Sequence, residues 1–187
     1  MSQATLPLTP AADIDLDRIK ATVRAIPDFP KPGILFRDVM PVLQDPELYR
    51  QTIDWFARAV APGSVDVVVG IESRGFIFGA PLAYALGVGF VPVRKRGKLP
   101  GDVVSHTYDL EYGTDTIEMH QGALAPHTRV LLVDDLLATG GTAGAAVKLI
   151  TSQGASIVQA AFMVKLDALQ GQKQLPEDLL TSVMIHY

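Results

Sequence analysis

Apolar residues recur at helical spacing in the first part of the chain. The positions that predict a first helix are Ile14 or Leu16, Ile19, Val23 and Ile26. Pro27 is expected to end this helix, because proline cannot continue it. A second helix is predicted to start at Asp45-Pro46, with aspartate as the cap and proline at the first helical position, and to stop at Pro62-Gly63.

From residue 66 onward, short apolar strands alternate with helices. Strands are predicted at residues 66–70, 90–93, 129–133 and 157–164, and helices at residues 76–86 and 141–152. Continuously apolar strands separated by helices are typical of parallel sheets that are covered on both faces. The predicted fold class is therefore α/β, a single domain over residues 13–187 with a mainly parallel, twisted sheet and helices on both faces. Residues 1–12, which contain Pro7 and Pro10, are predicted to form a disordered tail.

Residues 97–119 interrupt this alternation and are predicted to form a flexible hairpin flap. Residues 103–112 and 116–119 alternate polar with apolar positions around Gly113-Thr114-Asp115, as a solvent-facing hairpin does. They follow residues 97–101, which are rich in glycine, proline and lysine. A long excursion between core strands is often an active-site flap.

Composition narrows the function classes. The 187-residue chain is 48% hydrophobic and 19% charged, which indicates one well-buried globular core. Its net charge of −4 argues against general nucleic-acid binding, which needs a basic surface. No apolar run approaches the ~20 residues of a membrane span, and the N-terminus lacks the basic region of a signal peptide. The chain contains no cysteine, which excludes disulfides and thiolate chemistry and fits a cytoplasmic location.

Two adjacent aspartates end a predicted buried strand in the segment VLLVDDLLATGGT, residues 130–142. Asp134 and Asp135 repel each other and lose hydration there, so a bound partner must compensate. A vicinal diol would do so, because carboxylates only accept hydrogen bonds and two ribose hydroxyls donate them. A magnesium ion near Asp134 and Asp135 would also reduce the repulsion. The alternative is a solvated strand end.

A glycine-rich turn follows the aspartates and opens the next predicted helix. Glycines let the backbone approach a ligand closely, so helix-start amides and threonine hydroxyls would converge on one anion. The residues of this anion cradle are Ala138, Thr139, Gly140, Gly141 and Thr142. With the aspartates they predict a ribose 5-phosphate site, for which an ordinary strand-to-helix turn is the alternative. The dinucleotide motif GxGxxG after a strand and the P-loop motif are both missing from the sequence.

The same segment resembles the phosphoribosyl pyrophosphate (PRPP) motif of type I phosphoribosyltransferases, and its LLATGGT variant is similar to that of the adenine phosphoribosyltransferase family. Four further segments resemble this family in the same order: FPKPGILFRDVMPVLQDP (29–46), GIESRGFIFG (70–79), RKRGKLPG (94–101) and YDLEYG (108–113). Met40 departs from the pattern, in which Ser or Thr is expected before the proline. The resemblance implies a purine salvage enzyme, a homodimer with Mg²⁺ as cofactor, that converts adenine and PRPP into AMP and pyrophosphate.

The resemblance assigns pyrophosphate binding to two segments. In the family, the loop after the strand at residues 66–70 carries a cis, non-proline peptide bond, which here would join Glu72 to Ser73. Arg74 would offer planar donors to the leaving group and act in catalysis, and its alternative is a structural ion pair. The second segment is a basic run, for which a solvated charged face is the alternative. The residues assigned to pyrophosphate are Glu72, Ser73, Arg74, Arg94, Lys95 and Lys98.

The flap and a small N-terminal hood, residues 27–42, are implied to act on the base. Glu111 would exchange a proton with the imidazole ring of the purine as the glycosidic bond forms, and its alternative is a surface glutamate. The adenine-binding residues implied in the hood are Leu35, Phe36 and Arg37. The alternatives are a core position for Phe36 and an ion pair between Arg37 and Asp38.

Two other functions stay open from the sequence. A phosphoribosyltransferase for hypoxanthine, guanine or xanthine would carry the same ribose 5-phosphate site, because base choice lies in the hood. A non-catalytic, PRPP-sensing regulator would need a nucleic-acid-binding module, for which the roughly two dozen residues before the hood are too few.

Overall fold

The computed structural model describes residues 13–109 and 113–187. Packing within the chain separates two compact units, Met1–Trp55 and Phe56–Tyr187. The tail at residues 1–12 lies outside the described residues, and the single domain over residues 13–187 stays a prediction.

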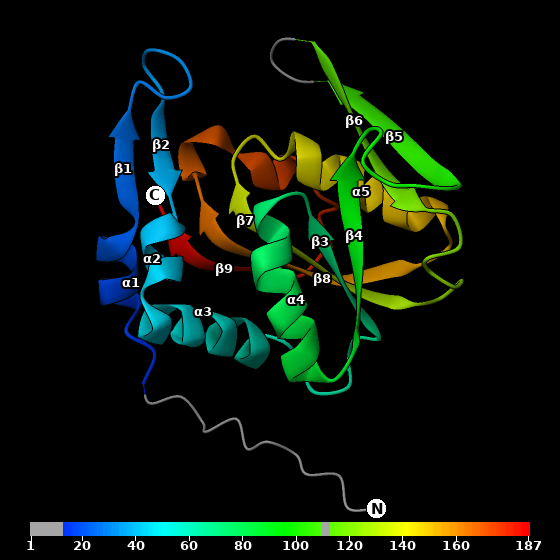
Figure 1. Ribbon diagram of the computed structural model, residues 1–187, viewed down its shortest axis with the longest axis horizontal. Helices are drawn as coiled ribbons and strands as arrows, with labels where there is room; N and C mark the ends of the chain where they lie inside the picture. Colours follow the sequence, from blue (N-terminus) through cyan, green and yellow to red (C-terminus); the bar gives the residue numbers. More distant parts are fainter. Residues whose placement is uncertain (1–12, 110–112) are drawn as a thin grey trace, which may run out of the picture. The chain divides into compact units, whose positions relative to one another are not determined.

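A seven-stranded sheet forms the centre of the second unit, in the order β5-β6-β4-β3-β7-β8-β9 (Figure 1). Its strands are β3 (Val67–Ile71), β4 (Gly89–Lys95), β5 (Val103–Asp109), β6 (Thr114–His120), β7 (Arg129–Leu137), β8 (Ser156–Lys165) and β9 (Thr181–His186). Pairing is parallel from β4 through β3, β7 and β8 to β9, and antiparallel where β6 joins β4 and β5. The predicted α/β class with a mainly parallel sheet is confirmed.

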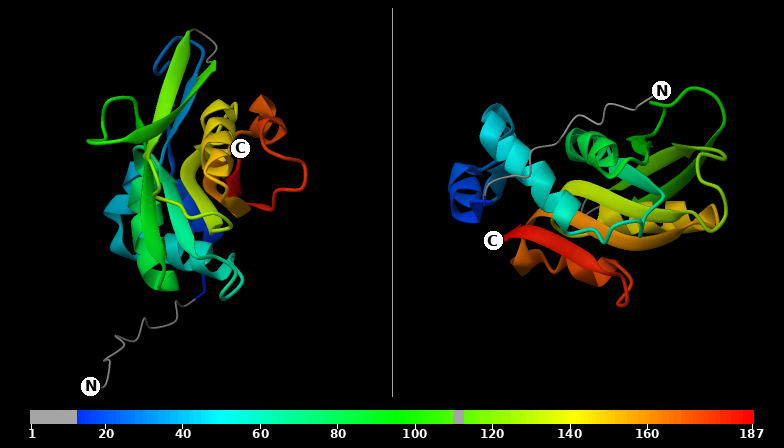
Figure 2. Two further views of the ribbon diagram at one scale, coloured as in Figure 1. Left: turned by 90° about the vertical axis from the view of Figure 1, so that its right-hand side faces the viewer. Right: turned by 90° about the horizontal axis from the view of Figure 1, so that it is seen from below.

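Helices α4 (Arg74–Leu86) and α5 (Gly141–Ser152) cover opposite faces of this sheet (Figure 2). Strand β3, which lies between them, is buried at all five positions. Val67 belongs to the core cluster that includes α5, whereas Val68 lies 3.5 Å from the position of a Cβ on Gly79 of α4. Because side chains alternate between the faces of a strand, a continuously apolar strand needs a helix on each side. The predicted two-sided cover is therefore confirmed.

The hairpin β5–β6 is less solvent-facing than its alternating pattern predicts. Strand β6 pairs with β4 at Arg94↔Glu118 and Lys95↔Ile117, so the hairpin extends the sheet. Ile117 and Met119 are 1% and 0% exposed as a result. This pairing joins segments that are distant in sequence, and a local pattern cannot reveal it. Residues 110–112, between the two strands, lie outside the described residues.

The carboxyl-terminal part of the second unit also differs from the prediction. Strand β7 continues past residue 133 to Leu137, because β8 pairs with it as far as Leu137↔Lys165. The 3-10 helices Asp167–Leu169 and Gly171–Gln174 and the strand β9 were not predicted. These segments are short, and β9 becomes a strand through its parallel pairing with β8.

The first unit contains a two-stranded antiparallel sheet and short helices. Its elements are α1 (Leu16–Thr22), β1 (Arg24–Pro27), β2 (Leu35–Asp38), α2 (Met40–Gln44) and most of α3 (Pro46–Arg58). The prediction of a helix up to Ile26 is wrong beyond Thr22, because residues 24–27 pair with β2 instead. Backbone hydrogen bonds to another strand thus replace those that a longer helix would have made.

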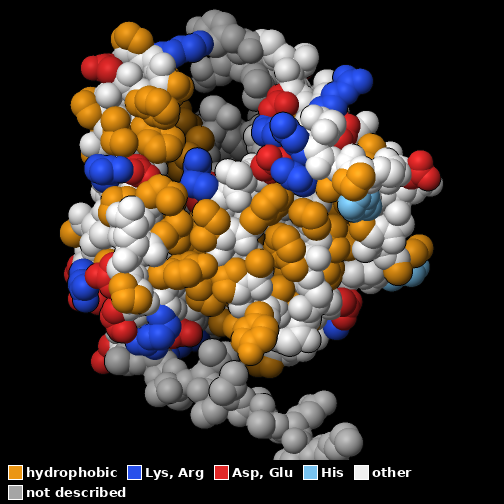
Figure 3. Space-filling view, in the orientation of Figure 1, with side chains coloured by type: hydrophobic (Ala, Val, Ile, Leu, Met, Phe, Trp, Pro, Cys, Tyr) orange, Lys and Arg blue, Asp and Glu red, His pale blue; other side chains and the backbone are white. Residues whose placement is uncertain are grey.

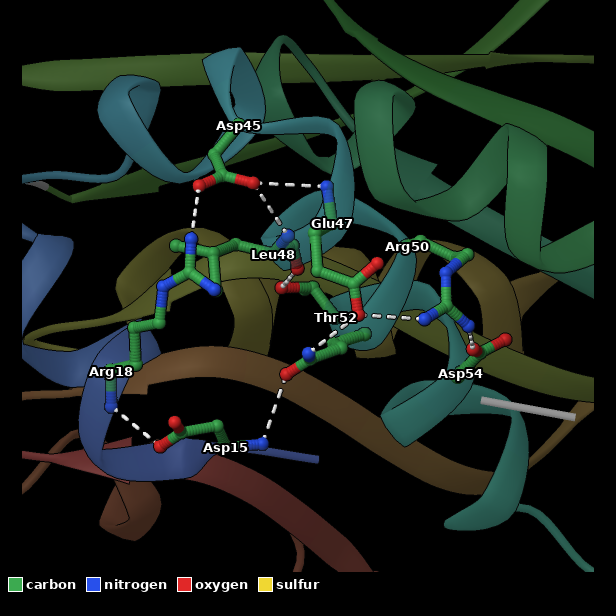
Figure 4. Close-up of polar contacts among 9 residues, drawn as sticks. Asp15, Arg18, Asp45, Glu47, Leu48, Arg50, Thr52 and Asp54 are labelled. Carbon is green, nitrogen blue, oxygen red and sulfur yellow. Dashed lines mark hydrogen bonds and ion pairs between the residues drawn. The ribbon is translucent and has the colours of Figure 1, made fainter. Parts of the chain in front are cut away.

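Helix α3 begins at the predicted cap (Figure 4). The Asp45 carboxylate accepts hydrogen bonds from the amides of Glu47 at 2.9 Å and Leu48 at 3.1 Å. It also accepts one from Nη2 of Arg18 at 2.7 Å. The hydrogen bond from the Leu48 amide is the main reason why the pKa of Asp45 lies below its usual value. An aspartate here satisfies helix-start amides that have no helical partner.

Candidate functional site

A cavity of about 310 Å³ lies at the carboxyl ends of β3, β4 and β7 in the second unit. Open α/β sheets bind ligands at this edge, where loops connect the strand ends to the following helices. The cavity is lined by Glu72, Ser73, Arg74, Lys95, Asp134, Asp135, Leu136, Ala138, Thr139, Gly140, Gly141, Thr142 and Ala143. Most of the predicted site residues of this unit therefore come together in one place.

Strand β7 presents two carboxylates next to each other at the cavity wall. Asp135 is 4% exposed, and its carboxylate forms an ion pair with Nε of Arg74. The amide of Asp135 donates a hydrogen bond to Oδ1 of Asp134 at 2.9 Å. Gly75 lets α4 start close to this pair, because a Cβ there would lie 2.7 Å from the carbonyl oxygen of Val133. The predicted acidic pair is thus held between a strand and a helix start.

The two carboxylates do not share the same environment. Burial, and then the negative charge of Asp135, raise the pKa of Asp134 well above its usual range. The Arg74 guanidinium works against this shift, but it contacts Asp135 directly. Asp134 therefore lacks sufficient positive charge around it in the protein alone, and hydrogen-bond donors or a cation in the cavity would stabilise its ionised form.

The glycine turn after β7 forms the opposite side of the cavity. Gly140 has a φ of +81°, a conformation that side chains other than glycine rarely adopt, and it precedes the first residue of α5. The amide of Gly144 donates to the carbonyl of Gly140 at 2.8 Å, so the amides of the three residues between them come before this first helical hydrogen bond. They point out of the helix start, where the helix dipole favours an anion. The residues of the predicted anion cradle thus lie around the start of α5, and phosphate binding by them stays a prediction.

The second 3-10 helix after β8, Gly171–Gln174, supports this turn from outside the cavity. A Cβ on Gly171 would overlap the carbonyl oxygen of Ala138 and lie 2.9 Å from the amide nitrogen of Gly140. A Cβ on Gly144 would lie 2.8 Å from the carbonyl oxygen of Gln174. The turn and the segment Gly171–Gln174 are thus in backbone contact. The sequence did not predict a role for Gly171, because no local sequence pattern around it indicates a contact with residues 138–144.

The loop between β3 and α4 carries the predicted cis peptide bond between Glu72 and Ser73. The Glu72 carboxylate accepts a hydrogen bond from the Lys95 amide at 2.8 Å and from Nε of Arg94 at 3.2 Å. Burial opposes ionisation of Glu72, but these two donors lower its pKa below the usual value. Glu72 therefore joins the ends of β3 and β4 at the cavity wall.

The basic run at the end of β4 is divided between different environments. Lys95 lines the cavity. Arg94 is instead paired with Glu72 and donates from Nη1 to the carbonyl of Lys98 at 2.9 Å. The side chain of Lys98 lies in an exposed part of the same turn. The structure thus brings one member of the predicted basic run, Lys95, to the cavity and pairs Arg94 with Glu72 instead.

Four predicted site residues lie outside the second unit or outside the described residues. Leu35, Phe36 and Arg37 are the first three residues of β2 in the first unit, where the ring of Phe36 meets that of Phe29 edge-on at 5.2 Å between centroids. Leu35 is 46% exposed. Glu111 belongs to residues 110–112, which the structure does not describe. The roles of these four residues stay predictions.

Two kinds of site are absent from the described residues. Across residues 13–109 and 113–187, no three histidine, aspartate or glutamate side chains are placed to hold a metal ion together. Within the same ranges, none of the helices has both the length and the apolar character needed to cross a membrane.

The chain is similar to known proteins over most of its length. The family model described as the phosphoribosyl transferase domain matches residues 42–183. The adenine phosphoribosyltransferase of Nostoc punctiforme is 55% identical over 168 residues, which cover 89% of this chain and 98% of the relative. Adenine phosphoribosyltransferase 1 of Triticum aestivum is 53% identical and covers 88% of this chain and 91% of its own length.

Solved structures show the same similarity. The adenine phosphoribosyltransferase of Thermoanaerobacter pseudethanolicus has a TM-score of 0.89 and 48% identity, over 92% of this chain and 99% of its own. The Saccharomyces cerevisiae enzyme, crystallised with an imino-altritol bisphosphate and adenine, has a TM-score of 0.86 and 41% identity, over 91% of this chain and 98% of its own. These matches confirm the predicted family resemblance and the predicted fold.

Proposed function

The chain belongs to the phosphoribosyl transferase family, and we propose that it joins adenine to the ribose of PRPP, with AMP and pyrophosphate as products. The observation that carries this proposal is the meeting of an acidic pair and a glycine turn in one cavity. The names of the relatives support adenine as the base and a place in purine salvage.

The ribose 5-phosphate of PRPP binds along residues 134–142. Asp134 and Asp135 accept hydrogen bonds from the two ribose hydroxyls, which add to the hydrogen bond that Asp134 accepts from the Asp135 amide. The 5-phosphate lies against the amides at the start of α5 and the hydroxyls of Thr139 and Thr142. Both ends of the sugar phosphate are held by one strand-turn-helix segment, so the anomeric carbon is fixed between them.

Pyrophosphate leaves toward the ends of β3 and β4. Arg74 and Lys95 line the cavity there and provide positive charge for the departing oxygens, together with polar groups of the Glu72–Ser73 loop. Arg74 is also tied to Asp135, so the group that stabilises the leaving group is anchored to the ribose site. A ring nitrogen of adenine bonds to the anomeric carbon while the bond from that carbon to pyrophosphate breaks. Catalysis rests on alignment and on charge stabilisation.

The base is held by Leu35, Phe36 and Arg37, and Glu111 takes the proton that the imidazole ring releases. The exposed apolar surface of Leu35 and the nearby ring of Phe36 supply a face on which a purine packs. A carboxylate suits this proton transfer, and a flap that excluded water would strengthen its electrostatic effect.

The residues at the acidic pair fit a magnesium ion that is bound mainly by the substrate. Mg²⁺ keeps several waters and uses few protein ligands, which agrees with a site that offers two neighbouring carboxylates. Asp134, with its raised pKa, is the residue that would hold the ion together with oxygens of PRPP. The bound ion would neutralise charge on the pyrophosphate.

The protein acts as a homodimer in the cytoplasm. Apolar side chains gather over α4 and β4 on one face of the second unit (Figure 3). Tyr84 of α4 is 72% exposed, and Phe76 meets Phe90 of β4 edge-on at 5.8 Å between centroids. A second copy would cover this apolar surface. The lack of cysteines suits a reducing compartment. A monomeric mass in solution would contradict the dimer.

The base assignment is tested by incubating the protein with PRPP, Mg²⁺ and one of four free bases. We expect kcat/KM for adenine to exceed that for hypoxanthine, guanine or xanthine by at least about 10²-fold, because a site that hydrogen-bonds one base edge leaves buried groups unpaired with another. Product nucleotides are separated by chromatography, with PRPP omitted as the control. Preference for another base would replace adenine and keep the ribose 5-phosphate site, whereas no product with any base would overturn the transferase.

The role of Glu111 is tested with the Glu111→Gln variant. We expect kcat to fall between about tenfold and a hundredfold, the low end for general acid-base catalysis, because the amide cannot take the proton. KM for both substrates should change less than kcat, because the residue acts on the transition state. Steady-state kinetics measure both constants. Turnover equal to that of the wild-type enzyme would remove Glu111 from the proton transfer.

A further inference from the structure

Tyr108 connects the hairpin β5–β6 to the wall of the cavity. It lies on β5, and its hydroxyl is 3.0 Å from Oγ1 of Thr142 at the start of α5. The Lys95 ammonium donates to the same hydroxyl oxygen at 3.2 Å. The hydroxyl also donates to Oδ2 of Asp115, its cross-strand neighbour on β6, at 3.2 Å. One hydroxyl thus joins the phosphate side of the cavity, through Thr142, to the pyrophosphate side, through Lys95.

The ring of Tyr108 is held in place independently of its hydroxyl. Tyr108 is half-buried and packs against the core cluster that includes α5. Its Cδ2 lies 3.7 Å from the position of a Cβ on Gly141, so the ring sits against the glycine turn. The Lys95 ammonium lies 5.8 Å from the ring centroid. Packing therefore fixes where the hydroxyl stands, and the hydroxyl can orient the polar groups around it.

The Tyr108 hydroxyl has one proton, but two of its three partners, Asp115 and Thr142, can accept it. A tyrosine hydroxyl donates one hydrogen bond and accepts up to two. Lys95 can only donate and Asp115, when ionised, can only accept, whereas Thr142 can do either. Lys95 also donates a hydrogen bond to Asp115 within their ion pair. When the Tyr108 hydroxyl donates to Asp115, the Thr142 hydroxyl must donate to Tyr108. When the Tyr108 hydroxyl donates to Thr142 instead, the Thr142 hydroxyl can donate its own hydrogen bond to another acceptor.

We propose that Tyr108 is a positioning residue for the 5-phosphate of the substrate, which orients the Thr142 hydroxyl through its own hydroxyl. The Lys95 ammonium is held in addition by its ion pair with Asp115. On phosphate binding, the Tyr108 proton turns from Asp115 to Thr142, and the Thr142 hydroxyl donates to the phosphate. Asp115 keeps a hydrogen bond from Lys95 in both states. The inference rests on the proposed function, because it takes residues 138–142 as the site of the 5-phosphate.

The Tyr108→Phe variant tests this role because it keeps the ring and removes the hydroxyl. We expect KM for PRPP and the Kd for ribose 5-phosphate to rise about tenfold, the effect of one or two lost hydrogen bonds near charged groups. KM for adenine and kcat should stay within about twofold, because the residue acts on ground-state binding of the phosphate. Steady-state kinetics and titration calorimetry with ribose 5-phosphate measure these constants.

A matched control exists on the same hairpin. Thr107 Oγ1 and Thr116 Oγ1 are 2.9 Å apart on the exposed side, next in sequence to Tyr108 and Asp115. Thr107→Val also removes one hydroxyl from the β5–β6 pairing, but none from the cavity wall. It should leave KM for PRPP within about twofold of the wild-type value. An equal rise of KM in both variants would mean that the hairpin acts as a whole, and would overturn the role of Tyr108.

A double-mutant cycle separates positioning from general packing. If Tyr108 acts through Thr142, the Tyr108→Phe effect on the Kd for ribose 5-phosphate should fall below about threefold in a Thr142→Val background. The full tenfold effect in both backgrounds would overturn the proposal. Weaker ribose 5-phosphate binding by Tyr108→Phe in a protein without transferase activity would support the positioning role and refute the proposed function. Normal turnover with an unchanged Kd for ribose 5-phosphate in Tyr108→Phe would support the proposed function and refute the positioning role of Tyr108.

Discussion

Exchanging either aspartate at the end of β7 for asparagine is expected to lower kcat/KM for PRPP about 10³-fold. Asp134 and Asp135 line one cavity with the glycine turn, and the proposed function has them accept hydrogen bonds from the ribose hydroxyls. Hydrogen bonds to a charged group are worth about 1.5–3 kcal/mol each, and a neutral amide loses much of two of them. Steady-state kinetics with varied PRPP measure the effect.

The same two substitutions should change the stability of the ligand-free protein in opposite directions. Ionisation of Asp134 costs free energy in the folded protein, because burial and the neighbouring Asp135 disfavour its charge, so Asp134→Asn should raise the Tm. The rise should be about 2–4 °C for each kcal/mol of repulsion that is removed. Asp135→Asn should lower the free energy of unfolding by about 1–3 kcal/mol, because it breaks the ion pair with Arg74. The effect stays below that of a fully buried pair, since the Arg74 side chain is 36% exposed.

The stabilisation by Asp134→Asn should depend on pH with a defined sign. The pKa of Asp134 is higher in the folded protein than in the unfolded chain, so the folded protein holds this proton more tightly. The contribution of Asp134 to the free energy of unfolding is therefore fully present below the pKa of about 4 in the unfolded chain. This contribution is lost as the pH rises through the raised pKa in the folded protein. The difference in Tm between Asp134→Asn and the wild-type protein should shrink as the pH falls from 7 through this range.

Asp178→Asn is a suitable control for both aspartate variants. Asp178 is exposed in the loop before β9, outside the cavity, so kinetics and Tm should stay close to the wild-type values. Equal losses of stability in Asp134→Asn and Asp135→Asn would contradict the electrostatic difference between the two carboxylates. An unchanged KM for PRPP in both variants would contradict the ribose site itself.

Gly171→Ala is expected to lower kcat/KM for PRPP about 10²-fold, although Gly171 does not line the cavity. Its Cβ would overlap the carbonyl oxygen of Ala138 and approach the Gly140 amide to 2.9 Å. Both contacts are with backbone, so the glycine turn must move as a whole. A displacement of about 1 Å in a positioning element can cost this much in rate. Kinetics with PRPP and calorimetry with ribose 5-phosphate would both report the displaced phosphate site.

Gly89→Ala provides the matched control for the glycine substitution. Gly89 begins β4, and its nearest contact for a new Cβ is Val67 Cγ2 at 3.8 Å, an ordinary van der Waals distance. This variant should keep kcat/KM within about twofold. Wild-type activity in Gly171→Ala would show that the turn does not depend on the segment Gly171–Gln174.

Local patterns in the sequence were sufficient for the parallel part of the fold and for the centre of the site. Continuously apolar runs such as residues 130–133 become strands with both faces buried, as is typical of parallel sheets covered by helices on both sides. The start of α3 was predictable because Asp45 and Pro46 act on amides two or three residues away. The acidic pair and the glycine turn were predictable for the same reason, since one strand-turn-helix segment places all of them.

Features that depend on residues distant in sequence were decided by the tertiary structure. Residues 24–27, which were predicted to be helical, pair with β2 instead. Strand β6 is buried because it pairs with β4. Arg94 forms an ion pair with Glu72, whereas Lys95 lines the cavity and donates a hydrogen bond to Tyr108. Sequence alone thus determined which chemical groups one segment holds together. Which charges face each other and which backbone segments touch depends on the tertiary structure. Those contacts join segments that are far apart in the sequence, and no local sequence pattern predicts them.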